Sequence, residues 1–529
     1  MRRWNGWGEE STSVALPEQG AAFLAARIGA GRPLPDASLD SVLARVPASR
    51  LPPHPLWATA ADDRLRHARG QSLPDWLAMR SGDFGVFPDA VAYPETATQI
   101  RELLALASAQ DLSLIVYGGG TSVAGHITPQ AGDRPVLTVS LARMNRLLEL
   151  DQSSQIATFG PGANGPQVES ELRAHGFTLG HFPQSWELST LGGWVASRSS
   201  GQQSLRYGRI EQLFAGGTLE TFAGPLQIPT FPASSAGPDL REMVLGSEGR
   251  FGILSEVKVR VSRLPAQEHF HAVFLPSWPQ ALDAVRELAQ ARVPLSMLRL
   301  SSAIETETQL ALAGHPRQIA WLEKYLGWRG AAQGKCMLTF GVTGNPRQNA
   351  ASLQQAKKLL RQAGGVFTGT LLGRKWAQSR FRFPYLRETL WQAGYAVDTL
   401  ETATDWSNVD HLLHRIEASL RGGPGGEPIH VFTHLSHAYG EGSSLYTTYV
   451  FRAAGSYADT LARWHTLKQA ASRTIVEHGG TISHQHGVGR DHAPYLPVEK
   501  GALGIAALQA LASHFDPERR LNPGVLLQP

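Results

Sequence analysis

Three consecutive glycines directly after a short apolar segment constrain this chain more than any other feature. Residues 112–117 form an apolar run typical of a strand, and Gly118, Gly119 and Gly120 follow at once, with Thr121 and Ser122 behind them. Glycines permit a tight turn whose successive N–H groups point at an anion such as a pyrophosphate. The pattern is neither a G-x-G-x-x-G nor a Walker loop, which argues against a Rossmann site and a phosphoryl transferase. Taken alone, it also fits an ordinary tight turn.

Three further segments rich in glycine and hydroxyl side chains follow the first, all four lying within about 140 residues. The second segment contains Gln184, Ser185, Ser189, Thr190, Gly192 and Gly193; the third contains Ser197, Arg198 and Ser200; and the fourth contains Glu248, Gly249, Gly252, Ile253 and Leu254. In this order the segments resemble the FAD-binding domain of the vanillyl-alcohol oxidase and p-cresol methylhydroxylase superfamily. Four ordered matches make coincidence a poor explanation.

This resemblance implies an FAD cofactor and a place for each segment around it. The first segment, with Tyr117 in front, would hold the pyrophosphate, and the second and third would line the diphosphate and the isoalloxazine ring. The fourth would pack on the ribose and adenine side. Some relatives carry a histidine in the glycine loop for a covalent flavin link, and this loop has none. We therefore expect non-covalent FAD.

The length of the chain and its alternation of helical and β-rich segments predict an α+β protein with more than one core. A chain of 529 residues exceeds the roughly 250 to 300 residues at which single cores stop growing. We expect a helical arm over residues 1–85 and a two-subdomain FAD-binding domain over residues 86–264. A cap domain that binds the substrate is expected over residues 265–465, followed by a helical segment over residues 466–529 that returns to the flavin. Residues 96–107 carry a Thr96/Gln99 capping box and an apolar helical face.

Two segments near the carboxyl end separate two enzyme groups within the superfamily. Its 2-hydroxy-acid dehydrogenases hold a divalent metal with histidines in one segment and a glutamate in another. Here Tyr446 stands near the position of a metal-binding histidine, and Gln485 replaces the glutamate. A phenol and a neutral amide are poor ligands for a divalent cation, so we expect no metal.

The same departures resemble the alkylglycerone-phosphate synthase family, which has a tyrosine in the first segment and three consecutive histidines in the second. The run here is His484-Gln485-His486, so its middle imidazole is missing. Further similarities are the Trp4-Asn5-Gly6-Trp7-Gly8 opening, Gly180-His181-Phe182-Pro183, Tyr385-Leu386-Arg387 and Thr399-Leu400-Glu401-Thr402, so that the resemblance covers nearly the whole chain.

The family's reaction assigns roles to four residues. It exchanges the acyl group of acyl-dihydroxyacetone phosphate for a fatty alcohol through a covalent adduct at the flavin N5 atom. By resemblance His486 would remove a proton from the carbon beside the ketone, with His484 next to it. Tyr446 would donate a hydrogen bond or a proton to the departing carboxylate, and Arg387 would bind the phosphate through its planar fork.

Each of these residues also has a purely structural interpretation. His484 and His486 are two apart in a segment that reads as extended, which would place both on one face. Tyr446 lies in a β-rich run where a core tyrosine is common, and the structural alternative for Arg387 is a surface ion pair with a carboxylate such as the adjacent Glu388. His434 and His437 are expected behind the first layer of site residues. The single cysteine, Cys336, is expected to be a buried apolar residue.

Two alternative functions stay open at this point. An FAD-linked dehydrogenase of a 2-hydroxy acid, such as D-lactate or 2-hydroxyglutarate, or of a polyol phosphate would use the same flavin domain, with His486 as its base. A flavin-binding protein without turnover is the third hypothesis, and the intact set of histidine, tyrosine and arginine argues against it.

The charge and hydropathy of the chain limit the kinds of partner that we expect. A net charge of +4 from 49 basic and 45 acidic residues gives no basic block, so nucleic acid is not expected. The excess is compatible with a phosphorylated, lipid-like substrate or with transient contact at a membrane surface. We find neither a secretory leader nor an apolar segment of the roughly 18 to 20 residues that a membrane span needs, and expect a cytoplasmic protein. Resemblance to the family implies a homodimer.

Overall fold

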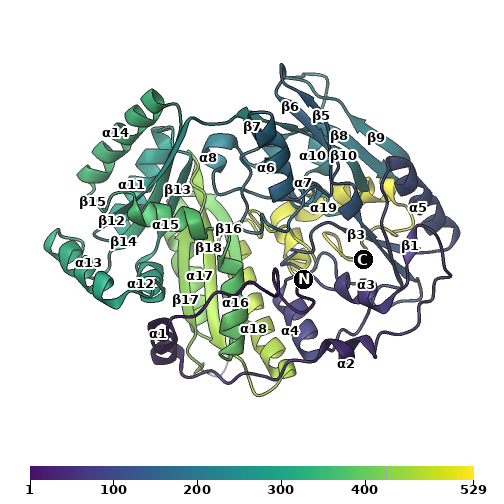
Figure 1. Ribbon diagram of the computed structural model, residues 1–529, viewed down its shortest axis with the longest axis horizontal. Coiled ribbons are helices and arrows are strands. Elements are labelled where there is room, and N and C mark those ends of the chain that lie inside the picture. The colour runs from purple at the N-terminus through teal and green to yellow at the C-terminus, as the bar shows by residue number, and fades with distance from the viewer. Residues whose placement is uncertain (424–425, 529) are drawn as a thin grey trace.

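The computed structural model describes residues 1–423 and 426–528, and its three large sheets lie in two halves of the molecule (Figure 1). One half holds a four-stranded and a five-stranded sheet, and the other holds a seven-stranded sheet flanked by most of the long helices. This arrangement confirms the α+β class.

The four-stranded sheet carries the glycine loop at the end of one strand. Its order is β1 (Trp57–Ala58), β2 (Ala90–Ala92), β4 (Val136–Ser140) and β3 (Ser113–Tyr117), with β2, β4 and β3 parallel. Helix α5 (Ala97–Ala109) buries the predicted apolar face. Its capping box is only half formed, because Thr96 accepts the N–H of Gln99 while the Gln99 side chain accepts the N–H of Glu95.

The five-stranded sheet is antiparallel and packs beside the first. Its strands run in the order β5 (Leu147–Asp151), β6 (Ile156–Phe159), β10 (Ile253–Arg260), β8 (Phe214–Thr221) and β9 (Gly224–Ile228). A two-stranded ribbon joins β11 (Ser262–Arg263) to β7 (Phe177–Thr178). The helices of this region are short: α6 (Gly165–Ala174), α7 (Leu191–Ser197), α8 (Ser204–Tyr207), α9 (Ile210–Leu213), α10 (Arg241–Val244) and the 3-10 turn η1 (Leu141–Arg143).

The seven-stranded sheet brings together the strands that carry the substrate-side residues. Its order is β15 (Val366–Phe367), β12 (Gln267–Leu275), β14 (Cys336–Gly344), β13 (Met297–Ser301), β17 (His430–Leu435), β18 (Gly442–Arg452) and β16 (Tyr395–Asp405). Pairing of β16 with β18 sets Glu401 directly opposite Tyr446. The helices of this half are α11 (Trp278–Gln290), α12 (Ala303–Leu312), α13 (Pro316–Trp328), α14 (Pro346–Gln362), α15 (Leu371–Ser379), α16 (Phe383–Gln392) and α17 (Trp406–Arg421).

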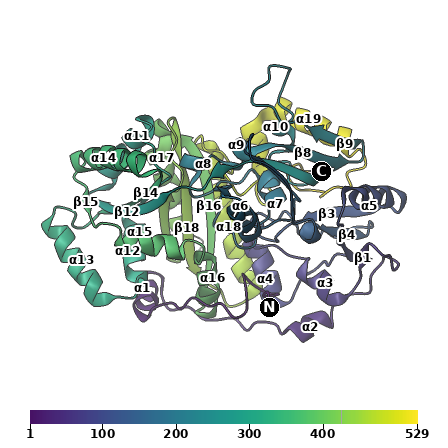
Figure 2. The ribbon, with the colours of Figure 1, turned by 45° about the horizontal axis from the view of Figure 1, so that its top comes forward.

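The amino-terminal segment, purple in Figures 1 and 2, runs along both halves. Its helices are α1 (Glu18–Ile28), α2 (Leu39–Leu43), α3 (Ala61–Arg66) and α4 (Leu73–Ser81). Helix α1 contacts α12 and α4 contacts α18, so the segment packs on the seven-stranded half while β1 joins the four-stranded sheet. It is therefore a helical arm that also contributes an edge strand.

The carboxyl-terminal segment, yellow in Figures 1 and 2, lies between the two halves. It contains α18 (Tyr457–Glu477), the 3-10 turn η3 (Ala493–Tyr495) and α19 (Leu496–Phe515), which is interrupted at Gly501. Beyond α19, Leu521 pairs with Leu114 of β3, and the N–H of Asn522 donates to the Leu114 carbonyl at 2.7 Å. The chain thus returns to the strand that precedes the glycine loop. Division of the chain at about residues 85, 264 and 465 stays our interpretation of these ranges.

Two further sequence expectations concern single features. Cys336 is buried, and burial raises the pKa of its thiol to about 12, so it is a packed, unreactive residue. Within the part of the chain that the structure describes, we find no helix with the length and apolar character needed to cross a membrane.

Candidate active site

A cavity of about 920 Å³ is lined by all four glycine-rich segments and by the substrate-side residues. Among the predicted residues, those that line it are Gly118, Gly119, Gly120, Thr121, Ser122, Gln184, Ser185, Ser189, Thr190, Gly192, Gly193, Ser197, Ser200, Glu248, Gly249, Gly252, Leu254, Arg387, Tyr446 and His486. The fold thus brings both groups of residues around one space.

The first two glycine-rich segments pack directly on each other. A Cβ atom on Gly119 would lie 1.9 Å from the carbonyl oxygen of Leu188, and Gly120 has a φ of +70°. No side chain fits at the first position, and the second backbone conformation favours glycine. The amino-terminal arm adds a contact, because Arg2 donates to the Gly119 carbonyl. The triple glycine is therefore a requirement of close packing in the cavity wall.

This side of the cavity fits a dinucleotide such as FAD. Its polar wall is the glycine loop with the hydroxyls of Thr121, Ser122, Ser185 and Ser189, which suit a pyrophosphate and ribose. Apolar side chains complete the wall and suit flat aromatic rings: Val116, Leu141, Leu219 and Leu254. Donors for the charged part and apolar surface for the rings are thus both present.

Three predicted cofactor residues have side chains outside the cavity. Tyr117 is buried and its hydroxyl donates to the carbonyl of Arg66 at 3.3 Å. Arg198 caps α7 in the left-handed conformation and pairs with Glu211 at 3.0 Å and Glu242 at 2.9 Å. Ile253 is fully buried in the core of the four-stranded sheet. Adjacent side chains in a segment point in different directions, so only some residues of a contiguous motif can face the cofactor.

Glu248 lines the cavity and also binds the loop after α18. Its carboxylate accepts the N–H groups of Val488 and Gly489, and lies 3.2 Å from the imidazole of His126. Burial lowers the pKa of His126, but the Glu248 carboxylate more than offsets it, and that pKa is raised overall. Glu248 therefore ties the loop after α18 to the flavin side of the cavity.

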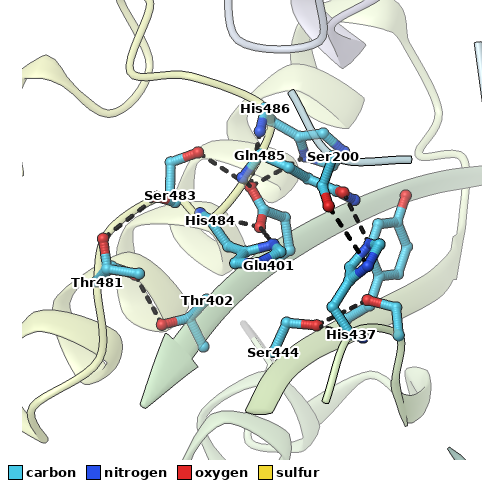
Figure 3. A network of polar contacts seen from close by, with 12 residues as sticks. Ser200, Glu401, Thr402, His437, Ser444, Thr481, Ser483, His484, Gln485 and His486 are labelled. Carbon is cyan, nitrogen blue, oxygen red and sulfur yellow. Dashed lines mark hydrogen bonds and ion pairs between the residues drawn. The ribbon is translucent and has the colours of Figure 1, made fainter. Parts of the chain in front are cut away.

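Glu401 organises the histidine segment, and sequence reasoning did not select it as a site residue. Its carboxylate accepts the backbone N–H groups of His484, Gln485 and His486, each at 2.9 Å, and the hydroxyl of Ser483 at 2.9 Å (Figure 3). Burial would raise the pKa of this carboxyl, but the neighbouring His486 and His484 outweigh it and hold that pKa well below its usual range. A buried anion thus holds the loop.

The expectation of an extended histidine segment is wrong. Residues 481–490 are an irregular, bent segment with no strand, because three successive amides turn toward one carboxylate. The two imidazoles therefore face different neighbours. The available signal was an isolated glutamate in the β-rich run of β16, which is an unusual residue for a buried strand.

His484 lies behind the cavity wall. Its Nε2 accepts from Arg209 Nη1 at 2.5 Å and lies 2.6 Å from the Tyr439 hydroxyl. Since arginine only donates, the ring is neutral with its proton on Nδ1, which lies 3.4 Å from Glu401. Burial lowers the pKa of this imidazole. His484 therefore positions the loop and does not face the cavity.

His486 faces the cavity, with its ring edge-on to Tyr446 at 5.6 Å between centroids. Burial lowers the pKa of His486, although Glu401, 3.7 Å from its Nδ1, opposes that shift. An imidazole with a lowered pKa is neutral at neutral pH and has a free lone pair. His486 has the state and the place of a general base.

Tyr446 also faces the cavity and is not a core residue of β18. Its hydroxyl donates to Thr399 Oγ1 at 3.2 Å, and its ring stacks on His434 at 4.9 Å. Burial raises the pKa of Tyr446 to about 12, so the phenol keeps its proton and can donate it. Tyr449 and Phe451 of the same strand occupy the core instead.

Arg387 lies on α16 with part of its guanidinium free. Nη1 donates to the Gln71 carbonyl at 2.6 Å, and the group lies over the ring of Trp76 at 4.5 Å. Nε and Nη2 are buried and have no hydrogen-bond partner among residues 1–423 and 426–528. These two nitrogens form the edge that binds an oxyanion with parallel hydrogen bonds. The expected pair with Glu388 is absent from the described chain, because Glu388 binds Arg80.

Gln485, His434 and His437 line the cavity as well, so the expectation that the two histidines lie behind the first layer of site residues is wrong. Gln485 Oε1 accepts from His437 Nε2 at 3.1 Å, and His437 Nδ1 lies 3.1 Å from Ser204 Oγ (Figure 3 shows the ring of His437). His434 lies 3.1 Å from the Glu305 carboxylate. Among the residues described, we find no group of three or more histidine, cysteine or acidic side chains that could hold a metal ion.

Comparisons with known proteins agree with this architecture. A family model for an FAD binding domain matches residues 88–224, and one for FAD linked oxidases, C-terminal domain, matches residues 264–526. The alkyldihydroxyacetonephosphate synthase of Caenorhabditis elegans is 30% identical over 476 residues, which cover 86% of this chain and 78% of the relative.

Solved structures show the same fold. A structure of an alkyldihydroxyacetonephosphate synthase superposes with a TM-score of 0.84 at 24% identity, covering 99% of this chain and 98% of that one. A p-cresol methylhydroxylase structure gives a TM-score of 0.69 at 12% identity, covering 89% of this chain and 93% of that one. The fold predicted from four short segments is thereby confirmed.

Proposed function

We propose that this chain, which belongs to the alkyldihydroxyacetonephosphate (alkylglycerone-phosphate) synthase family, exchanges the acyl group of an acyl-dihydroxyacetone phosphate for a fatty alcohol, with FAD as its cofactor. The observation that carries this proposal is the set of three groups on one cavity: neutral His486, protonated Tyr446 and the free edge of Arg387. They supply a base, an acid and an anion site.

FAD would be held by the glycine loop, by the hydroxyls of Thr121, Ser122, Ser185 and Ser189, and by the apolar wall that includes Leu254. Bound there, the flavin would supply an electrophilic nitrogen, N5, for the substrate carbon. We propose non-covalent binding, since the glycine loop has no histidine. Acid denaturation should release free flavin into the supernatant, and flavin that stays with the precipitated protein would contradict this.

His486 moves the proton, and Tyr446 and Arg387 bind the anionic groups. The neutral imidazole of His486 takes a proton from the carbon beside the substrate ketone, since its lowered pKa leaves the lone pair available. Tyr446 donates a hydrogen bond to the carboxylate that leaves, a role for which a raised pKa keeps its phenol protonated. Arg387 holds the phosphate through Nε and Nη2.

The decisive experiment follows labelled fatty alcohol into acyl-dihydroxyacetone phosphate on the purified flavoprotein. We expect exchange by the wild type and a loss of about a hundredfold or more in His486→Ala, the usual scale for a missing general base. His175→Ala, at an exposed position, is the matched control. Both variants should keep their flavin absorbance, which separates loss of the base from loss of the cofactor.

The alternative of an FAD-linked dehydrogenase uses the same base and is tested on the same preparation. D-lactate, D-2-hydroxyglutarate and glycerol 3-phosphate are added separately without oxygen. A dehydrogenase would bleach the flavin at a rate fit for turnover, whereas an exchange reaction without net oxidation leaves it oxidised. Rapid bleaching by any one of them would overturn the exchange proposal.

We also propose that the protein makes peripheral contact with a membrane beside the mouth of the cavity. Leu371 and Phe383 line the cavity yet are 58% and 43% exposed, and Trp321 and Trp328 on the neighbouring α13 are 78% and 80% exposed. Exposed apolar groups of this kind are typical of interaction surfaces. Flotation with phosphatidylcholine vesicles should fall in Trp321→Ser/Trp328→Ser relative to wild type, and unchanged flotation would contradict the proposal.

A further inference from the structure

A second guanidinium on the cavity, that of Arg380, has no partner in the proposed reaction. It follows α15 directly and lines the same cavity as Arg387. Its Nε and Nη1 are buried without a hydrogen-bond partner in the described parts of the chain, residues 1–423 and 426–528. Arginine keeps its charge at neutral pH, and burying a charge without a counter-ion is costly. The position therefore calls for an anion.

The surroundings of Arg380 are aromatic. Its guanidinium carbon lies 4.8 Å from the ring centroids of both Phe182 and Phe381, and 5.7 Å from that of Trp376. Aromatic faces attract a cation but accept no strong hydrogen bonds, so they compensate part of the charge and leave the N–H groups free. Burial among these rings lowers the pKa of Arg380.

Nearby carboxylates are already engaged. Glu169 accepts the Thr178 hydroxyl and the N–H groups of Leu179 and Gly180. Glu268 accepts from Gln203 at 2.6 Å. Neither lies within ion-pair distance of Arg380 in the part of the chain that is described, so both carboxylates offset its charge only from a distance and no direct ion pair forms.

The place of Arg380 along the cavity indicates which anion it meets. Leu371 lines the cavity and is exposed, so it marks the mouth, whereas Arg380 and Arg387 line it with guanidinium nitrogens that are buried. Between Leu371 and Arg380 the lining residues are Leu372, Lys375, Trp376 and Ser379, of which Leu372 and Trp376 give apolar contact to an alkyl chain, whereas Arg387 already has a free edge for the phosphate. An amphiphilic anion fits this order, with its tail toward the mouth and its charged end at Arg380.

We propose that Arg380 binds the carboxylate of a fatty acid, the product released when the acyl group leaves. This inference rests on the proposed function for the origin of the carboxylate, but the binding itself does not require turnover. Arg380 is thereby a specificity determinant for the charged product, because the incoming fatty alcohol has no charge for it to recognise.

Equilibrium binding to the flavin-loaded protein tests this proposal. Dodecanoate and 1-dodecanol, which differ in the charged end, are titrated against wild type, Arg380→Met and Arg380→Lys, with the flavin absorbance or fluorescence as the signal. Loss of a charge-assisted interaction should weaken dodecanoate binding by roughly ten- to a hundredfold in Arg380→Met, with an intermediate effect in Arg380→Lys. Dodecanol binding should change less than about twofold, a small difference on the same scale.

Two controls separate the outcomes. Arg374→Met removes an exposed arginine of α15 outside the cavity lining and should bind dodecanoate as the wild type does. Dihydroxyacetone phosphate should bind normally to Arg380→Met and weakly to Arg387→Met. The proposal is overturned if Arg380→Met keeps wild-type affinity for dodecanoate, loses dodecanol equally, or loses the phosphate ligand instead. Failure of the exchange reaction in wild type would overturn the proposed function while leaving this binding result to stand by itself.

Discussion

The cofactor side of the cavity consists of backbone and hydroxyl groups from four short segments, whereas its substrate side consists of long side chains from β16, β18, α16 and the loop after α18. On the first side, packing of Gly119 on Leu188 sets the shape. On the second, one buried carboxylate, Glu401, holds the backbone that carries His486. Cofactor binding and chemistry should therefore fail separately when either side is altered.

The largest effect should come from adding a side chain to the glycine loop. Gly119→Ala sets a Cβ atom 1.9 Å from the Leu188 carbonyl, so the two loops must separate. We expect flavin content to fall by about tenfold or more, a change that about 1.4 kcal/mol of lost binding would produce. Flavin absorbance per protein measures it. Gly132→Ala, where a Cβ meets nothing within 4 Å, should retain full flavin, and equal loss in both variants would contradict the packing argument.

Removing the charge of Glu401 should damage the chemistry and spare the cofactor. Glu401→Gln keeps the shape but weakens the hydrogen bonds from the amides of residues 484–486. Exchange activity should fall by roughly ten- to a hundredfold, the scale of hydrogen bonds to a charged group. Glu441→Gln, at an exposed position, serves as control. Loss of flavin in Glu401→Gln would show that the two sides are coupled after all.

The acid limb of the pH profile should report the same contact. His486 acts as a neutral base, so kcat/KM should fall with acid around a pKa below the ordinary value of about 6.5. Since Glu401 raises that pKa, the limb should move to lower pH in Glu401→Gln.

The stability that neutral His486 contributes should also be lost in acid, as the activity is. Its folded pKa is depressed, so the contribution is present above the unfolded pKa and is lost as pH falls through the folded value. Thermal unfolding followed from neutral to acid pH measures this loss. If the acid limb of kcat/KM stays at the same pH in Glu401→Gln, Glu401 does not set the pKa of His486.

The smallest effect should come from Arg198, which belongs to the motif but not to the cavity wall. Arg198→Ala removes surface ion pairs with Glu211 and Glu242, which contribute little to stability. Flavin content and exchange should both stay within about twofold of wild type, since exposed pairs contribute about 0 to 1 kcal/mol. A large loss of flavin would show that the contiguous motif describes the site better than the cavity does.

Much of the cofactor side was predictable because its signal is local. The glycine-rich segments follow one another in the order of the domain they resemble. Glycines 118–120, Ser189 and Gly193 from these segments line the cavity as the sequence indicated. The wrong predictions concern residues whose side chains point away from the cavity although their neighbours face it. Tyr117 and Ile253 are buried in the protein core, and Arg198 lies at the surface. A segment can be recognised without knowing which of its side chains face the ligand.

The substrate side was predictable only in part. His486, Tyr446 and Arg387 were selected by resemblance and do share the cavity, but the histidine segment was expected to be extended and is bent. His484 was expected beside the base and lies behind the wall, fixed by Arg209 and Tyr439. Nothing in the run 481–490 reveals the carboxylate around which it turns.

The sequence by itself indicated FAD and an α+β fold, because four glycine-rich segments in linear order resemble a known FAD-binding domain and consecutive amides in such loops can hold a pyrophosphate. Only the tertiary structure decided which groups face the substrate. Glu401 lies 83 residues before His484, and strand pairing sets it opposite Tyr446. Burial then fixes the protonation of His486 and Tyr446, and burial is a property of the packed fold.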